Sequence, residues 1–211
     1  LDVDMAATTV SGVSSGGFMA VQFHVAHSST VSGAGALAAG PYYCARGSLR
    51  TALQDCMAPE SRTALPDAKA LAAVAFDLAR AGRIDATGNL ARSRAWLFAG
   101  TRDSTVLPAV VDRLRSFYLN FLRESAVVLV GDIDAGHGMV TANAGGQCGA
   151  TDPPFINDCD YDAAGRLLAH LLGPLAAPRP DASGVLVKFD QREFANGNAY
   201  SISMADAGYA Y

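Results

Sequence analysis

A short segment rich in glycine and serine carries the clearest chemical signal in the chain. Residues 12–16 read GVSSG and match the G-x-S-x-G pattern of a nucleophilic serine. Residues 5–10, an expected buried strand, precede it, and residues 18–26 follow with apolar side chains at helical spacing. In a strand-to-helix turn of this kind the serine hydroxyl projects where it can attack an ester carbonyl. We therefore predict that Ser14 is the nucleophile and that the N–H of Ser15 stabilises the oxyanion.

The same segment has two other interpretations, and the first interpretation requires glycine at particular positions. Ser15 could be the nucleophile, or the segment could be a turn that only caps a helix. If Ser14 is the nucleophile, the turn is so tight that Gly12 and Gly16, two residues away on either side, must lack side chains. Gly17 would then let the helix pack close to the sheet.

A serine nucleophile needs a base, and the chain offers four histidines. His24 and His27 fall in the helix after the serine, and His170 falls near the end of a later helix, so all three are interpreted as helix-surface or capping residues. His137 stands in a Gly-His-Gly loop just after residues 125–130, an expected strand. A loop at the carboxyl end of a strand suits a catalytic base, so we predict His137; the alternative is an exposed loop histidine.

The base in turn needs an acid that orients it. Asp103 follows the apolar strand predicted over residues 94–100, and its alternative role is a turn or cap residue. Asp132 and Asp134 are rivals, but both lie too close to His137 in sequence to occupy a separate strand end. The order serine, aspartate, histidine is that of α/β-hydrolases. We expect the His137 ring to lie within hydrogen-bond reach of both the Ser14 hydroxyl and the Asp103 carboxylate.

The elements that must position these residues alternate between strands and helices. The apolar runs over residues 31–40, 94–100 and 125–130 are strand-sized and continuous. Segments with apolar residues at helical spacing lie between or after these runs, over residues 68–80, 110–121 and 162–172. This alternation predicts an α/β fold, an α/β-hydrolase-like, mostly parallel sheet with helices on both faces.

The character of the chain changes after Gly173, where three prolines follow within seven residues. We expect residues 1–173 to form the catalytic core, with the nucleophile, acid and base. Residues 174–211 are expected to be a linker with edge strands at 184–189 and 199–202. These strands would lead into a missing C-terminal part of the same domain.

Composition excludes several classes of protein. Hydrophobic residues make up 50% of the chain and charged residues 17%, with a formal net charge of −4, which excludes a disordered chain. Basic residues do not cluster, which argues against nucleic-acid binding. No apolar run reaches the ~18 residues of a membrane helix. We expect a monomer that binds neither nucleic acid nor membrane and needs neither a metal nor a cofactor.

The four cysteines fall into two local pairs. Short loops close most readily, which favours Cys44–Cys56 and Cys148–Cys159 as disulfides. Free buried thiols and a zinc site are the alternatives, although neither pair has zinc-type spacing. Disulfides would place the protein in an oxidising compartment, so we expect it to be secreted.

Five blocks of sequence resemble the extracellular polyhydroxybutyrate depolymerases that have a circularly permuted, single-domain α/β-hydrolase fold. These blocks are VSGVSSGGFMAVQFHVAHSS, GAGALAAGPYYCA, FAGTRDSTV, DAGHGMVT and PPFINDCDYDAAG. The resemblance covers nearly all of the chain, with the blocks in the family's order. It implies the same nucleophile, acid, base, oxyanion donor and cysteine pairs as above: Ser14, Asp103, His137, Ser15, Cys44 with Cys56, and Cys148 with Cys159.

The resemblance also implies a function. It is that of a secreted serine esterase hydrolysing poly(3-hydroxybutyrate) or its oligomers through an acyl-enzyme, without metal or cofactor. The alternatives are a carboxylesterase acting on acetylated or feruloylated polysaccharide, and a non-catalytic polymer-binding fragment. Tyr42, Tyr43 and Phe155 are candidate substrate contacts, with core or loop packing as their other interpretation.

The resemblance breaks off at the end of the chain. The family continues past a segment like AGYAY into a strand with an LHGC motif that carries the second oxyanion donor. Only thirteen residues precede Ser14, so we expect that donor to come from later in the chain or from outside it.

Overall fold

The computed structural model describes residues 4–177, 184–195 and 205–211. The chain divides into two compact units, Leu1–Leu175 and Ala176–Tyr211, and each is described by itself.

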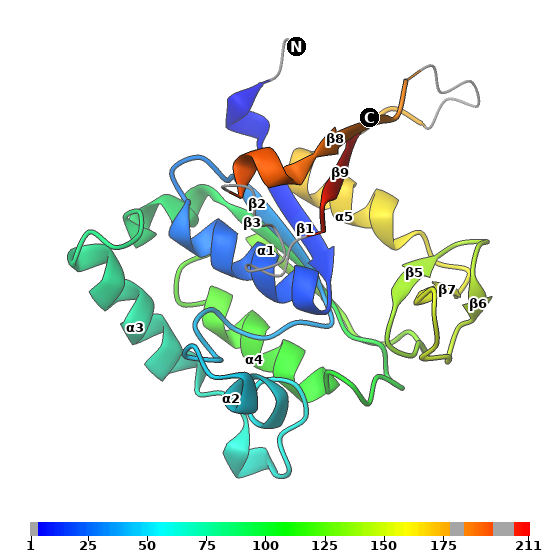
Figure 1. Cartoon of the computed structure of the whole chain (residues 1–211). Coiled ribbons are helices and arrows are strands. Elements are labelled where there is room, and N and C mark those ends of the chain that lie inside the picture. Colours follow the sequence, from blue (N-terminus) through cyan, green and yellow to red (C-terminus); the bar gives the residue numbers. More distant parts are fainter. Residues whose placement is uncertain (1–3, 178–183, 196–204) are drawn as a thin grey trace. The chain divides into compact units, whose positions relative to one another are not determined.

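The first unit is built on a four-stranded parallel sheet in the order β1-β2-β3-β4 (Figure 1). The strands are β1 (Thr9–Val13), β2 (Gly33–Leu37), β3 (Arg94–Phe98) and β4 (Val127–Val130). They are in register across the sheet, with Val10 opposite Ala34, Ala34 opposite Ala95 and Ala95 opposite Val127. Because all four run in one direction, their carboxyl ends meet at one edge, where open α/β sheets place their sites.

Helices cover both faces of the sheet, as expected from the sequence. Successive side chains of a strand point to opposite faces, and β3 shows the consequence. Ala95 and Leu97 pack in one cluster with α1, α3 and α4, whereas Trp96 and Phe98 pack in a second cluster with α5 (Figure 1). The helices are α1 (Ser15–Ala26), α3 (Ala68–Arg80), α4 (Pro108–Tyr118) and α5 (Ala163–Leu172).

The expectation of a strand over residues 5–10 is wrong at its first half. Met5–Ala7 forms a 3-10 turn, η1, because the Asp4 side chain accepts a hydrogen bond from the Ala6 N–H and caps it. The strand β1 begins at Thr9 and continues through Val13, directly up to Ser14.

Both cysteine loops contain short elements that the sequence patterns did not indicate. These are α2 (Leu49–Gln54) in the first loop and β5 (Met139–Thr141), β6 (Gly146–Gln147) and β7 (Ile156–Asp158) in and beside the second. The remaining short turns of this unit are η2 (Arg62–Ala64), η3 (Thr87–Arg92) and η4 (Glu124–Ala126).

The structure joins Cys44 to Cys56 and Cys148 to Cys159, the pairing that loop closure favours. All four cysteines are therefore in disulfides, so the zinc and free-thiol alternatives are wrong. Among the described residues, no helix has both the length and the apolar character needed to cross a membrane.

The second unit contains an antiparallel pair, β8 (Val187–Asp190) with β9 (Ala207–Ala210), and the short turn η5 (Gln191–Phe194). The strand expected over residues 184–189 overlaps β8. The strand expected over residues 199–202 lies outside the described residues.

His24 points into the core, so its expected place on a helix surface is wrong. It lies on the inner side of α1 and is 0% exposed. Its Nδ1 is 3.0 Å from the hydroxyl of Tyr118 on α4, while its Nε2 is buried without a hydrogen-bond partner among the described residues. Burial disfavours the charged imidazolium and lowers the pKa of His24 to about 4.

This burial makes stability depend on pH. The unfolded chain takes up the His24 proton near pH 6.5, whereas the folded chain resists it down to about pH 4. Stability is therefore full above pH 6.5 and falls as the pH drops toward 4, by about 3 kcal/mol. In urea unfolding at pH 7.5 and pH 4, the wild type should lose about that much more than His24→Gln. The matched substitution, His27→Gln at an exposed position, should leave the loss of stability between pH 7.5 and pH 4 as large as in the wild type. An equal loss in all three proteins would refute the lowered pKa of His24.

Candidate active site

Ser14 lies in a strained turn between β1 and α1. Its backbone has φ 56° and ψ −123°, a conformation that non-glycine residues rarely adopt. The Ser14 N–H donates to the Leu37 carbonyl at 2.9 Å, which ties the turn to the end of β2. A serine held in this way at a strand-to-helix turn is the arrangement of a nucleophile elbow, where strain serves function.

Two of the three glycines singled out from the sequence, Gly12 and Gly17, make the turn sterically feasible. A Cβ on Gly12 would lie 2.3 Å from the Gly16 carbonyl carbon, so Gly12 is required. A Cβ on Gly17 would lie 2.9 Å from both the Gly12 and the Leu37 oxygens, as expected for close packing on the sheet. The requirement for Gly16 is wrong, because a Cβ there meets nothing within 4 Å.

These contacts predict opposite outcomes for two neighbouring substitutions. Gly17→Ala should lower the free energy of unfolding by about 2 kcal/mol, because backbone oxygens cannot move away from the added methyl group. Gly16→Ala should change it by less than about 0.5 kcal/mol. Urea unfolding of both variants measures the difference. Equal stability of the two variants would contradict the packing described for the elbow.

Asp103 and His137 meet at the carboxyl edge of the sheet. Asp103 follows β3, His137 follows β4, and the His137 Nδ1 lies 2.8 Å from the Asp103 Oδ2. The other carboxylate oxygen, Oδ1, accepts the N–H groups of Thr105 and Val106, both at 2.9 Å. Asp103 is 4% exposed and His137 is 7% exposed, so the pair is shielded from water. His137 is thus not an exposed loop histidine.

The second disulfide loop holds the His137 loop in place through residues that the sequence patterns did not single out. The His137 N–H donates to the Thr151 hydroxyl at 3.0 Å. Asn157, only 1% exposed, donates to the carbonyls of Cys148 and Ala150, both at 2.9 Å. The Gly136 N–H donates to that same Cys148 carbonyl at 2.8 Å. A lone asparagine carries no spacing signal, so only the structure reveals this role.

The rival acids make other contacts. Asp134 is exposed and pairs with Arg102, with 2.6 Å between Nη2 and Oδ2, which lowers the Asp134 pKa. Asp132 is also exposed. Of the other histidines, His170 has its Nε2 3.1 Å from the Ala126 carbonyl.

The structure brings together the acid and the base but does not bond the base to the nucleophile. Within the described part of the chain, neither the Ser14 Oγ nor the His137 Nε2 makes a hydrogen bond. Such contacts are often long without a ligand and tighten in the substrate complex. The contact between Ser14 and His137 therefore stays a prediction.

Ser15 begins α1, the position expected for an oxyanion donor. The first N–H groups of a helix have no partner within the helix, and the helix dipole places partial positive charge there. A negatively charged oxygen formed beside Ser14 would meet these groups.

An apolar pocket of about 450 Å³ adjoins Ser14 and Ser15. Tyr43 lines it and is 41% exposed, which suits a substrate contact. Tyr42 is 6% exposed and packs near Phe117, so its packing interpretation is the right one. Phe155 is 43% exposed on the loop before β7 and is not among the residues that line the pocket.

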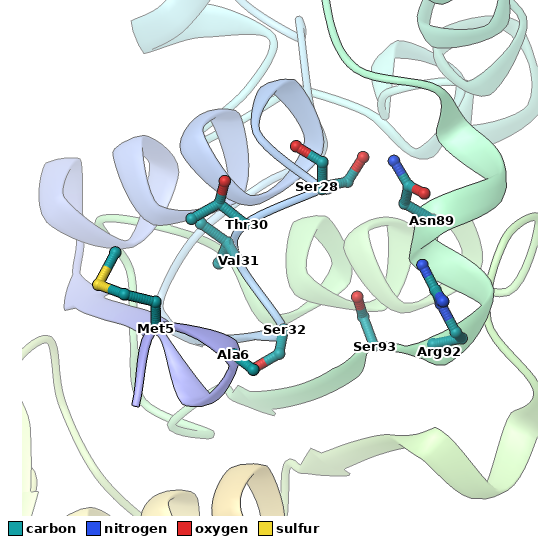
Figure 2. A pocket seen from close by; sticks show the side chains of 10 residues that line it. Met5, Ala6, Ser28, Thr30, Val31, Ser32, Asn89, Arg92 and Ser93 are labelled. Carbon is teal, nitrogen blue, oxygen red and sulfur yellow. The ribbon is translucent and has the colours of Figure 1, made fainter. Parts of the chain in front are cut away.

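A second pocket, of about 470 Å³, lies at the amino ends of β2 and β3, away from the carboxyl ends that carry Ser14, Asp103 and His137 (Figure 2). Ser32 and Ser93 line it just before β2 and β3 begin, together with Asn89, Arg92 and Met5. Within the part of the chain that the structure describes, its lining includes neither a histidine nor a carboxylate, the side chains expected of the base and acid in ester hydrolysis.

The chain is similar in sequence to curated depolymerases. The chain is 44% identical over its whole length to the poly(3-hydroxybutyrate) depolymerase of Delftia acidovorans, of which it spans 42%. It is 31% identical over its whole length to the polyhydroxybutyrate depolymerase of Talaromyces funiculosus, of which it spans 60%. The chain thus spans about half the length of the curated relatives that it matches. No protein-family model matches it.

Two solved structures match the fold. The crystal structure of the PHB depolymerase from Penicillium funiculosum gives a TM-score of 0.82 at 31% identity, covering 99% of this chain and 63% of that one. A serine-to-alanine variant of a PHB depolymerase, complexed with an R3HB trimer, gives 0.81 at 29% identity with the same coverage. The α/β-hydrolase-like fold and the resemblance to polyhydroxybutyrate depolymerases are therefore confirmed.

Proposed function

We propose that this chain is the catalytic part of a serine esterase that hydrolyses poly(3-hydroxybutyrate) or its oligomers. The observation that carries the proposal is the 2.8 Å hydrogen bond between His137 and Asp103 at the sheet edge where the strained turn presents Ser14. The similarity to depolymerases over the whole chain supports the choice of a polyester among esters.

The proposed reaction has two stages. The Ser14 Oγ bonds to the ester carbonyl carbon while the His137 Nε2 takes its proton, and the carbonyl oxygen becomes an oxyanion beside the Ser15 N–H. When the C–O bond breaks, His137 returns the proton to the departing hydroxyl end. In the second stage His137 removes a proton from water, whose oxygen bonds to the acyl carbon. His137 then returns the proton to the Ser14 Oγ as the bond between that oxygen and the acyl carbon breaks and the carboxylic acid end leaves. Asp103 holds the imidazole in the required tautomer throughout.

The setting of this activity follows from the same features. Two disulfides suit an oxidising compartment, which supports secretion. We further propose that residues 1–173 form the catalytic core, that residues 174–211 are a linker with edge strands of the same domain, and that the protein acts as a monomer on oligoesters.

The substrate class can be tested directly with the protein that carries this chain. A 3-hydroxybutyrate trimer should be cleaved to dimer and monomer, as followed by liquid chromatography and mass spectrometry. Acetylated xylan and feruloylated polysaccharide are the comparison substrates. Hydrolysis of those alone would identify a different esterase. Failure to hydrolyse even p-nitrophenyl acetate would favour a non-catalytic binding protein.

A further inference from the structure

The pocket beside Ser14 has one wall formed by α1. Phe18, Met19 and Gln22 line it at the three- and four-residue spacing that places side chains on one side of a helix. With a rise of about 1.5 Å per residue, Gln22 lies roughly 12 Å along the helix from Ser14. A ligand whose ester carbon sits at the Ser14 hydroxyl can therefore extend along this wall.

The loop closed by the first disulfide forms the facing wall. Leu49 and Leu53 of α2 line the pocket, as do Met57 and Tyr43. Arg46 is the one charged residue among the described residues of the lining, and it is exposed. A pocket of about 450 Å³ with this lining suits a neutral, apolar chain rather than a charged group.

Gln22 is a polar residue in this apolar wall, and its amide is turned toward the protein. Its Oε1 accepts the Tyr43 N–H at 2.9 Å, and its Nε2 donates to the Phe18 carbonyl at 3.2 Å. Tyr43 has φ 59°, in the left-handed region that side chains disfavour, so its position needs support from its surroundings. The hydrogen bond that the Tyr43 N–H donates to Gln22 supplies that support and joins the disulfide loop to the nucleophile helix.

We propose that Gln22 is a positioning residue that holds Tyr43 as a wall of this pocket, and that the pocket binds an apolar arm of the ester substrate. The inference rests on the proposed function. It adds that the first disulfide loop determines the length of the substrate arm that the pocket accepts. Gln22 acts on this length by holding the loop at Tyr43, and it does not touch the reacting atoms.

Three variants test the proposal in the protein that carries this chain. Gln22→Leu removes both hydrogen bonds at similar size, Gln22→Glu keeps an acceptor for the Tyr43 N–H, and Ala52→Phe fills the pocket from α2. Ala73→Phe, on the exposed side of α3, is the matched control for added bulk. Each protein is assayed for kcat and KM on p-nitrophenyl acetate to octanoate, and on ethyl to octyl acetate.

The readout is the ratio of kcat/KM for the longest ester to that for the shortest. Gln22→Leu and Ala52→Phe should lower this ratio about tenfold, mainly through KM, as expected when a hydrophobic arm loses its binding wall. Gln22→Glu and Ala73→Phe should stay within about threefold of the wild type. A fall confined to the acyl series places the acyl arm in the pocket, and a fall confined to the alkyl series places the alcohol arm there.

Unchanged ratios in both series for Gln22→Leu and Ala52→Phe would overturn the proposal. So would an equal fall in kcat for every ester in variants that stay folded, because the ratio of long to short esters is then unchanged. If Gln22→Leu does not fold, Ala52→Phe decides. An active wild type with an unchanged ratio contradicts only this inference, whereas a wild type that hydrolyses no ester contradicts the proposed function itself.

Discussion

Ser14→Ala is expected to lower kcat for ester hydrolysis by about 10⁴-fold or more while the protein stays folded. Removing the nucleophile of a serine, histidine and aspartate triad has effects of this size, because the acyl-enzyme route is lost. The elbow conformation does not depend on the hydroxyl, since the Ser14 side chain makes no capping hydrogen bond at the start of α1. Initial rates with p-nitrophenyl butyrate and a thermal unfolding curve measure the two properties.

The adjacent serine provides the control for this prediction. Ser15→Ala removes a hydroxyl but keeps the backbone N–H that is proposed to bind the oxyanion, so its kcat should stay within about tenfold of the wild type. The reverse outcome, an active Ser14→Ala and an inactive Ser15→Ala, would move the nucleophile to Ser15.

Asp103→Asn is expected to lower kcat by about 10⁴-fold with little change in fold. The Asp103 Oδ1 accepts two backbone N–H groups, so the amide oxygen of asparagine should occupy that place. The amide NH₂ then faces the His137 Nδ1 and donates to it. The imidazole proton moves to Nε2, which can no longer accept the proton of Ser14.

Asp134→Asn is the matched substitution at the rival carboxylate. Asp134 is exposed and pairs with Arg102, and exposed pairs contribute little to stability. Its kcat should stay within about threefold of the wild type. A loss at position 134 comparable to that at position 103 would show that the wrong acid has been assigned.

The acid and base of this site could be predicted from the sequence because the ends of its apolar strands can be located there. Asp103 and His137 each follow an apolar run, and parallel strands bring their carboxyl ends to one edge, so two residues 34 positions apart meet. Ser14 could be predicted as well, because GVSSG stands between a β-branched strand and a helix, the setting of a nucleophile elbow.

Other features depend on contacts that have no sequence period. Side-chain spacing along α1 did not separate the buried His24 from a surface residue, because the helix is apolar on most sides and its orientation is set by packing. The role of Gln22 depends on a backbone N–H in a left-handed residue 21 positions away. Gly16 was expected to be essential because it lies two residues from Ser14, as Gly12 does. Backbone atoms instead lie close to the Cβ positions of Gly12 and Gly17.

Covalent labelling by a fluorophosphonate tests most directly whether Ser14 is an activated nucleophile. The Oγ of an activated serine attacks phosphorus and displaces fluoride, and peptide mass spectrometry locates the resulting adduct. The triad proposed here predicts a single adduct on Ser14, formed in the wild type and not in a His137→Gln variant. An adduct on Ser15, or hydrolysis of esters by a protein whose Ser14 is never labelled, would contradict it.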